Sequence, residues 1–360
     1  GYYLPIVSGA SVAFSRSIPQ LASDLLAIKP TVMVSVPRIF ERVYGKIQDK
    51  LAKEKPIKQK LFMKAVDAGW QKFQYQQGKA GWSPALLFHP VLDKLVGAKV
   101  REKMGGRMRL TVCGGAALSD SIARFFIGLG IPILQGYGLT ETSPVISVNT
   151  LQSNDPSSIG VVLPGVEVGI GENDEILTRS DSVMLGYWKN EQASSEIFDK
   201  DGWLHTGDKG KLENGHLYIT GRIKEIIVLA NGEKIPPSDM ELAVSLDTMI
   251  EQSMIIGEGR SFLSALVVLN EEALDQYREQ HKLKPDWDFT QDQQLKKVLL
   301  GKIKAALHDF PGYAKIRRIT ICNEPWSVEN GLLTPTLKAK RAKIESAYTT
   351  QVNAMYEAHN

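Results

Sequence analysis

The sequence predicts an α/β fold in three parts: a parallel-sheet α/β subdomain over residues 1–150, a small β subdomain over 151–222, and a small α+β domain over 223–360. Three observations indicate this division. A strand–loop–helix–strand unit lies in the first part, turns rich in Gly and Asn separate short strands in the second, and helical patterns return in the third.

The first part begins with helical patterns. Apolar residues recur at helical spacing over residues 18–28, a β-branched run at 31–36 predicts a strand, and Pro37 then begins another helix. Residues 55–100 are typical of amphipathic helices, with Lys and Gln side chains on a solvated face.

The strand–loop–helix–strand unit follows, with strands expected at 108–112 and 131–134 and a helix at 119–129. This order predicts a parallel sheet that binds ligands at the carboxyl ends of its strands. The glycine-rich run 114–116 comes directly after the first strand, where glycine lets backbone approach a flat ligand. A purely structural turn explains that run equally well.

Turn and cap signals define the other two parts. Asn214-Gly215 stands between two alternating runs and predicts a hairpin. Ser238 is expected to cap a helix over residues 239–246. The remaining expected elements are strands at 225–229, 264–269 and 316–321, a helix at 295–307, and a short final helix.

The composition excludes several classes of protein. The net charge of +3 and pI of about 8.6 are too mild for a nucleic-acid-binding protein, and no apolar run reaches the roughly 20 residues of a membrane span. Only two cysteines, Cys113 and Cys322, are present, which argues against a disulfide framework or structural zinc and fits a reducing cytosol. The first residues read as the middle of a packed unit, so we expect a fragment of a longer protein.

A polar run, QGYGLTETSP, is expected as a loop after the strand at 131–134. Tyr137 offers an aromatic face on which a base can stack. Thr140 offers a hydroxyl suited to a phosphate oxygen, and Glu141 offers a carboxylate suited to Mg²⁺. A loop that caps itself is the structural alternative.

Three further charged residues suit the rest of a nucleotide. Asp208 ends the run WLHTGD, and its carboxylate could accept from both ribose hydroxyls, while Arg222 could donate to ribose or phosphate oxygens. Lys338 lies in NGLLTPTLKAKR, and its ammonium would offset the repulsion between a carboxylate and a phosphate. Alone, each of these runs is more typical of an ordinary turn or a solvated surface. His205 and His216 stand in no zinc-ligand or triad spacing.

Taken in order, these runs resemble the core motifs of the adenylate-forming (AMP-binding) superfamily of acyl-CoA synthetases, luciferases and peptide-synthetase adenylation domains. The matching patterns are YGLTE, HTGD, GR-x-K-E and the T-x-x-x-K-x-x-R spacing of Thr334, Lys338 and Arg341. The likeness extends from the first residues to about residue 350. SVPRIFERVY, CGGAALS, NGEKIPP and LTPTLKAKR are most similar to bacterial long-chain fatty acid–CoA ligases, and Thr336-Leu337-Lys338 stands where peptide synthetases carry Ser-Gly-Lys.

The resemblance implies a two-step reaction in which ATP and a fatty acid give an acyl-adenylate, and the thiol of coenzyme A then displaces AMP. It implies catalytic roles for Thr140, Glu141 and Lys338, with Mg²⁺ held by Glu141. Lys224 falls at the hinge about which a mobile C-terminal domain would rotate between the two steps, where many relatives carry aspartate. The implied nucleotide-binding residues are Gly114, Gly115, Ala116, Gln135, Gly136, Tyr137, Gly138, Thr140, Asp208, Arg222 and Lys338.

One element of the superfamily is not in this sequence. The Ser/Thr/Gly-rich loop that grips the β- and γ-phosphates, and much of the acyl tunnel, are expected upstream of the first residue. We therefore expect a C-terminal portion of a ligase that is impaired or inactive alone.

Two other functions stay open. A fatty acyl-AMP ligase would pass the acyl chain to a carrier protein, although such relatives typically carry an insertion that the sequence after Arg222 lacks. A non-catalytic nucleotide- or acyl-binding module is the second. We expect a cytoplasmic protein with small-molecule substrates and no nucleic-acid partner, and leave open peripheral contact with the inner membrane face and a homodimer.

Overall fold

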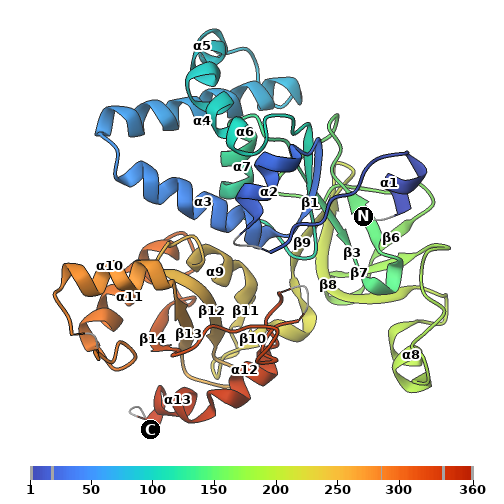
Figure 1. The fold of residues 1–360 in the computed structure, drawn as a ribbon. Coiled ribbons are helices and arrows are strands. Elements are labelled where there is room, and N and C mark those ends of the chain that lie inside the picture. The colour runs from blue at the N-terminus through green and yellow to red at the C-terminus, as the bar shows by residue number, and fades with distance from the viewer. Residues whose placement is uncertain (1–2, 18–19, 285, 335–336, 358–360) are drawn as a thin grey trace. The chain divides into compact units, whose positions relative to one another are not determined.

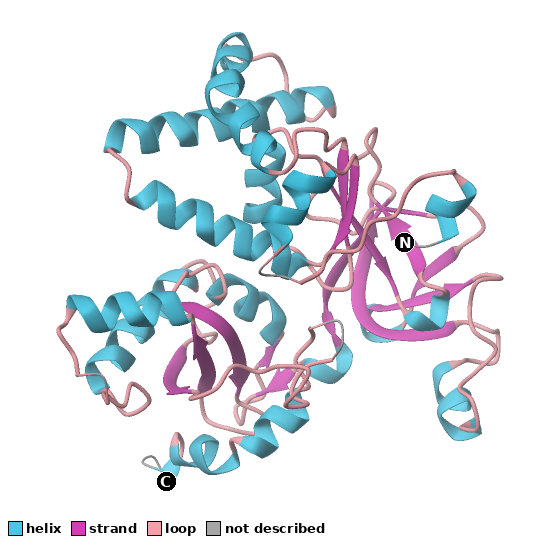
Figure 2. Ribbon diagram, in the orientation of Figure 1, coloured by secondary structure: helices cyan, strands magenta, loops and turns pink. Residues whose placement is uncertain are grey.

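The computed structural model describes residues 3–17, 20–284, 286–334 and 337–357 (Figures 1 and 2). The chain forms two compact units. The first comprises Gly1–Thr206 with Gly210–Ile219, and the second comprises Gly207–Lys209 with Thr220–Asn360.

Among the described residues, nine strands form one mixed sheet in the order β1-β2-β3-β4-β5-β9-β8-β7-β6. Strands β1 to β3 pair in parallel, which confirms the expected parallel sheet, and β3–β4, β4–β5, β5–β9 and β6–β7 pair antiparallel. The strands expected in the segment 151–222 thus extend the same sheet. The strands are β1 (Val32–Ser35), β2 (Leu110–Cys113), β3 (Ile133–Gly138), β4 (Val145–Val148), β5 (Val161–Val162), β6 (Glu167–Ile170), β7 (Glu175–Arg179), β8 (Leu204–Glu213) and β9 (His216–Arg222).

Helices cover the parallel part of this sheet (Figure 1). Phe40 and Phe126 are fully buried and meet edge to face, with ring centroids 5.5 Å apart. Gly69 and Gly128 let α4 and α7 approach so closely that a Cβ on either would strike the other helix's backbone. The helices are α1 (Tyr3–Val7), α2 (Leu21–Ile28), α3 (Pro37–Ala52), α4 (Pro56–Gln76), α5 (Ala85–Leu92), a π-helical segment (Asp93–Gly97), α6 (Ala98–Lys103), α7 (Asp120–Gly128) and α8 (Glu191–Ile197).

The second unit is built on a three-stranded sheet of the described residues, in the order β12-β13-β14. Strand β13 is buried along its whole length because both of its faces are covered. Leu263, Ala265 and Val267 face one core, which contains residues of α9 and α11, and Leu266 and Val268 face another, which contains residues of α12 and α13. The elements are β10 (Ile227–Val228), β11 (Lys234–Ile235), α9 (Pro237–Val244), β12 (Ile250–Ile256), β13 (Leu263–Leu269), α10 (Glu271–Gln280), α11 (Gln293–Ala306), β14 (Ile316–Ile321), α12 (Arg341–Ala347) and α13 (Thr349–Ala354).

Two local predictions were wrong. The run beginning at Gln135 was expected as a loop, but β3 continues to Gly138 because β4 supplies antiparallel partners, with Gly136 opposite Val148. Ser238 does not cap α9: the N-cap is Pro236, and Pro237, whose φ is already suited to a helix, stands at the helix start. The expected hairpin is confirmed, since both Asn214 and Gly215 adopt positive φ, at 51° and 79°. Within the described ranges, no helix is both long enough and apolar enough to cross a bilayer.

Candidate active site

The glycine loop after β2 lies beside strand β3. The Gly114 amide donates to the carbonyl of Ser35 at the end of β1, and a Cβ on Gly114 would lie 3.4 Å from the carbonyl oxygen of Gly136. Gly115 has a φ of +87°, a conformation that side chains rarely adopt. The structure therefore brings the predicted residues Gly114–Ala116 and Gln135–Gly138 together at the carboxyl ends of parallel strands.

Gln135 is buried, and its amide joins two loops. Its Oε1 accepts from the Leu118 amide at 3.0 Å, and its Nε2 donates to the carbonyl of Pro156. Gln135, which was predicted to lie at the edge of the nucleotide, thus fixes the backbone at Leu118 and at Pro156. The sequence did not indicate these contacts.

Tyr137 is also largely buried, with 8% of its surface exposed. It packs in a cluster with Ile146, Ile159, Ile176 and Leu217. Its stacking on a base stays a prediction.

Thr140 and Glu141 lie in a 3₁₀ turn, Thr140–Thr142, directly after β3. Thr140 is exposed, and Glu141 is half-buried. Tyr187 donates from its hydroxyl to Oε1 of Glu141 at 2.8 Å, and the Met184 amide donates to the Glu141 carbonyl at 2.8 Å. Burial, followed by this carboxylate, raises the pKa of Tyr187. Tyr187 is a contact of the candidate site that sequence reasoning missed, because it lies 46 positions from Glu141 and nothing in the intervening sequence links the two.

In the second unit, Asp208 and Arg222 form an ion pair. Nε of Arg222 donates to Oδ1 of Asp208 at 2.7 Å, and the Asp208 side chain is only 6% exposed. Gly207 precedes it with a φ of +70° inside β8. Glu225 lies 3.5 Å from the same guanidinium. Burial acts to lower the pKa of Arg222, but Asp208 and Glu225 outweigh it, and the pKa is raised.

Lys338 lies near this ion pair. Desolvation lowers its pKa below the usual value of 10.5, the positive charge of Arg222 acts in the same direction, and Asp208 and Glu225 oppose it. Lys338 and Thr334 close a turn through two hydrogen bonds, from the Lys338 amide to Oγ1 of Thr334 at 3.0 Å and from the Thr334 amide to the Lys338 carbonyl at 2.8 Å. The structure therefore gathers three of the predicted residues, Asp208, Arg222 and Lys338, in one unit. Thr336 lies outside the described residues.

A second ion pair fixes the chain just after this turn. Arg341, the first residue of α12, donates to Oε1 of Glu241 at 2.6 Å and to the carbonyl of Ile255. The same Oε1 accepts from the Ile255 amide at 2.7 Å. Glu241 was not predicted, since nothing local in α9 distinguishes it from a solvated carboxylate.

Lys224 lies in a 3₁₀ turn, Ile223–Glu225, that joins β9 to β10. This turn belongs to the second unit, which the main chain enters at Thr220. Lys224 therefore lies inside the second unit, four residues after the point where the main chain enters it, and its role as a hinge stays a prediction.

The described residues contain no group of three or more His, Cys, Asp or Glu side chains that could hold a metal ion. Mg²⁺ is commonly bound through one or two carboxylates together with substrate phosphates, and the single carboxylate of Glu141 fits that pattern.

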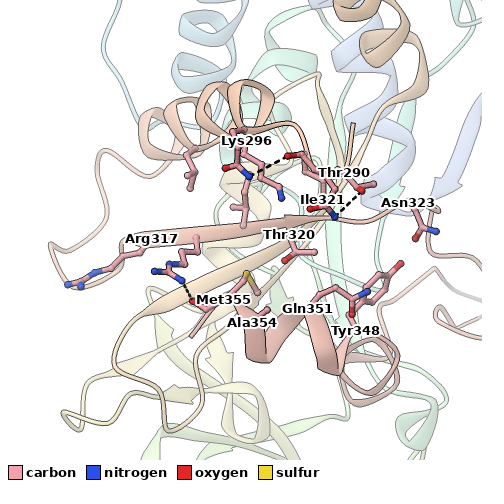
Figure 3. Close-up of a pocket in the computed structure, with 15 residues that line it drawn as sticks. Thr290, Lys296, Arg317, Thr320, Ile321, Asn323, Tyr348, Gln351, Ala354 and Met355 are labelled. Carbon is pink, nitrogen blue, oxygen red and sulfur yellow. Dashed lines mark hydrogen bonds between the residues drawn. The ribbon is translucent and has the colours of Figure 1, made fainter. Parts of the chain in front are cut away.

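The second unit also carries a groove of about 700 Å³ between α11, β14 and α13 (Figure 3). Lys296, Arg317 and Arg318 line it, and Arg318 donates to the carbonyl of Met355 at 2.9 Å. No predicted site residue lies in its wall. The groove is therefore separate from the candidate site.

Comparison with known proteins places both units in one family. Residues 1–188 match the AMP-binding enzyme family, and residues 224–360 match the AMP-binding enzyme C-terminal domain. The chain is 34% identical over 358 residues to the long-chain-fatty-acid–CoA ligase FadD15 of Mycobacterium bovis, covering 97% of this chain and 58% of that protein. It is 33% identical to long-chain-fatty-acid–CoA ligase 5 of Rattus norvegicus, covering 96% and 52%. The chain thus spans about half the length of these relatives.

Solved structures share the fold. The adenylation domain of a carboxylate reductase from Mycobacterium chelonae aligns with a TM-score of 0.73 at 24% identity, covering 95% of this chain and 49% of that one. The corresponding domain from Segniliparus rugosus, in complex with AMP and a co-purified carboxylic acid, aligns with a TM-score of 0.71 at 21% identity, covering 97% and 50%. With the two family matches, these similarities show that the chain belongs to the AMP-binding enzyme family, whose members are adenylate-forming enzymes.

Proposed function

We propose that this protein activates a long-chain fatty acid with ATP, forming an acyl-adenylate and pyrophosphate, and then transfers the acyl group to coenzyme A. The observation that carries the proposal is the gathering of Asp208, Arg222 and Lys338 in one unit. The relatives named above as long-chain-fatty-acid–CoA ligases support the choice of acid and acceptor.

Each of the three charged groups has a separate task. The Asp208 carboxylate, held by Arg222, accepts from the ribose hydroxyls. The Lys338 ammonium lies between the fatty-acid carboxylate and the α-phosphate, where it offsets their repulsion as the new bond forms. Lys338 is exposed in this structure, and its ammonium would offset this repulsion most strongly where bound substrates exclude water from around it.

The first unit would bind the rest of the nucleotide. Gly114 to Ala116 and Gln135 to Gly138 form the adenine site, and the Thr140 hydroxyl contacts the α-phosphate. Glu141 holds Mg²⁺ with the substrate phosphates. The ion, when bound, supplies charge neutralisation on those phosphates, and Tyr187 orients the carboxylate that receives it.

A rotation about Lys224 would allow one site to serve both half-reactions. It would withdraw Lys338 after the first step and bring the loop at residues 229–235 towards the acceptor thiol. A fatty acyl-AMP ligase remains the second candidate, but Ile226 alone separates the 3₁₀ turn from β10, so the connection holds no insertion of the kind that hinders this rotation. We also propose a cytoplasmic location, which the two buried, unpaired cysteines support.

The test separates the two steps. In the whole protein, Lys338→Ala should abolish formation of acyl-adenylate, measured as pyrophosphate release, yet leave thioester formation from supplied acyl-adenylate largely intact. Lys340→Ala, a lysine two residues further along the chain, is the matched control and should affect neither step. Equal loss of both steps in Lys338→Ala would contradict the role assigned to Lys338.

Two further measurements define the substrates. With the whole protein, pyrophosphate release across acids of two to twenty carbons would give the preferred chain length of the acid. A carrier protein offered in place of coenzyme A would detect the second candidate. Calorimetric titration of the chain with AMP tests nucleotide binding alone, and Asp208→Asn should weaken it. Unchanged affinity in that variant would exclude the ribose contact.

A further inference from the structure

The helical segment between Arg42 and Lys103 carries far more positive charge than the rest of the chain. It contains 14 basic and five acidic residues out of totals of 43 and 40, so the remainder holds 29 basic and 35 acidic residues. The chain's mild net charge therefore conceals a strongly cationic segment in an otherwise acidic protein. A field of this kind concentrates anionic partners near one face.

The same segment exposes large apolar side chains. Helix α5 has no charged residue, yet Leu87, Phe88 and Val91 are 66%, 64% and 61% exposed. Their spacing puts them on one face of the helix, Leu86 and Leu92 are half-buried, and α5 packs on α4. Two further large apolar side chains are exposed close to α5 in the chain, Trp82 before it, 60% exposed, and Leu95 after it, 46% exposed.

Exposed lysines follow the apolar helix along the chain. Lys94 and Lys99 are exposed in the π-helical segment and in α6, which continue directly from α5. Within the first unit, α5 lies beyond α4, away from the sheet (Figure 1). An apolar helix face preceded by an exposed tryptophan and followed by exposed lysines is typical of helices that lie in the interface of a bilayer.

We propose that α5, with the turn before it, docks the protein on an anionic lipid surface. Leu87, Phe88 and Val91 enter the boundary between head groups and acyl chains, and Lys94 and Lys99 contact lipid phosphates. The charge favours a lipid surface over a second copy of this chain, because two copies of so cationic a segment repel each other. This surface does not depend on the reaction proposed above.

Vesicle flotation of the chain tests the proposal directly. Vesicles of equal parts phosphatidylcholine and phosphatidylglycerol should bind at least about tenfold more protein than vesicles of phosphatidylcholine alone, since each lysine near an anionic surface strengthens binding about fivefold. Rising salt should release the protein. The double variants Leu87→Ser/Phe88→Ser and Lys94→Glu/Lys99→Glu should each weaken binding by about tenfold or more.

Matched controls lie elsewhere on the first unit. Leu212→Ser removes a leucine that is 50% exposed on β8, and Lys200→Glu reverses an exposed lysine beyond α8; neither should change binding. The altered side chains are exposed, so circular dichroism should show an unchanged fold. As a second measurement, brominated lipids should quench tryptophan emission, and Trp82→Phe should remove most of that quenching.

Three results would overturn the proposal. They are equal binding to neutral and anionic vesicles, binding that the α5 variants do not alter, and absence of quenching that depends on Trp82. Sedimentation measures self-association and so distinguishes a lipid surface from a second copy of the chain. If the α5 variants abolish self-association and leave vesicle binding unchanged, a second copy covers this face and the lipid assignment is wrong.

Discussion

Arg341 donates a hydrogen bond of 2.6 Å to Glu241, a residue one hundred positions earlier in the chain. The bond joins the first turn of α12 to helix α9, and the turn that carries Lys338 ends just before it. Both side chains are mostly buried, 19% exposed for Glu241 and 23% for Arg341. The position of the proposed catalytic lysine therefore depends on a pair that lies outside its own loop.

Removing the charge of Glu241 should destabilise the second unit. In Glu241→Gln the guanidinium of Arg341 loses its anionic partner, and we expect a loss of about 1–3 kcal/mol in the free energy of unfolding, below the range for fully buried pairs. Urea unfolding measures it. The control is Arg278→Ala, which breaks an exposed pair with Asp275 and should cost less than about 0.5 kcal/mol. Equal losses of unfolding free energy in the two variants would show that the Glu241–Arg341 pair stabilises the second unit no more than an exposed pair does.

Lys338 should lose its proton at a lower pH than an ordinary lysine. Desolvation and Arg222 lower the pKa of Lys338 below 10.5. Because only the neutral amine reacts with an acylating reagent, the reactivity of Lys338 should rise at a lower pH than that of a free lysine. Quantitative acetylation followed by mass spectrometry measures this. Arg222→Met should move the transition to higher pH, since a positive neighbour is removed and Asp208 remains. Arg179→Met, which breaks a surface pair with Glu167 in the first unit, should leave it unmoved.

Gln135 should contribute to stability through its two loop contacts. Gln135→Leu would leave the Leu118 amide and the Pro156 carbonyl without this partner, and each such buried group costs about 1–3 kcal/mol. Thermal unfolding of the first unit should show the loss. Gln192→Leu, whose wild-type amide bonds Glu196 on the exposed helix α8, should change stability by less than about 0.5 kcal/mol. An unchanged thermal stability in Gln135→Leu would show that water or a rearranged loop replaces these hydrogen bonds.

In the whole protein, Tyr187→Phe should shift the Mg²⁺ dependence of pyrophosphate release to higher Mg²⁺ concentrations. The hydroxyl that orients Glu141 is removed, and losses of about tenfold or more in metal affinity are typical for such outer contacts. A titration of activity with Mg²⁺ measures the change. Tyr313→Phe removes a hydroxyl from a 45% exposed ring and serves as the control. Tighter Mg²⁺ binding in Tyr187→Phe would mean that the hydroxyl competes with the ion.

Periodic patterns and turn chemistry identified many of the elements in advance. The parallel strands around β2, the helices over residues 55–100 and the Asn214-Gly215 hairpin were all predicted, because each is determined by residues close in sequence. Strand β12 and helix α8 were not. Gly136 and Gly138 have low intrinsic strand propensity, and they are in a strand because β4 pairs with them.

The sequence by itself determined the family, the order of the motifs and the charged groups that they contribute. Local spacing encodes these, since each motif is a short run with its own chemistry. Only the tertiary structure decided which side chains hold those groups in place: Tyr187 on Glu141, Arg222 on Asp208, and Glu241 on Arg341. Hydrogen bonds and ion pairs form between groups brought within about 3 Å by packing, and partners 46 or 100 residues apart have no pattern in the sequence that links them.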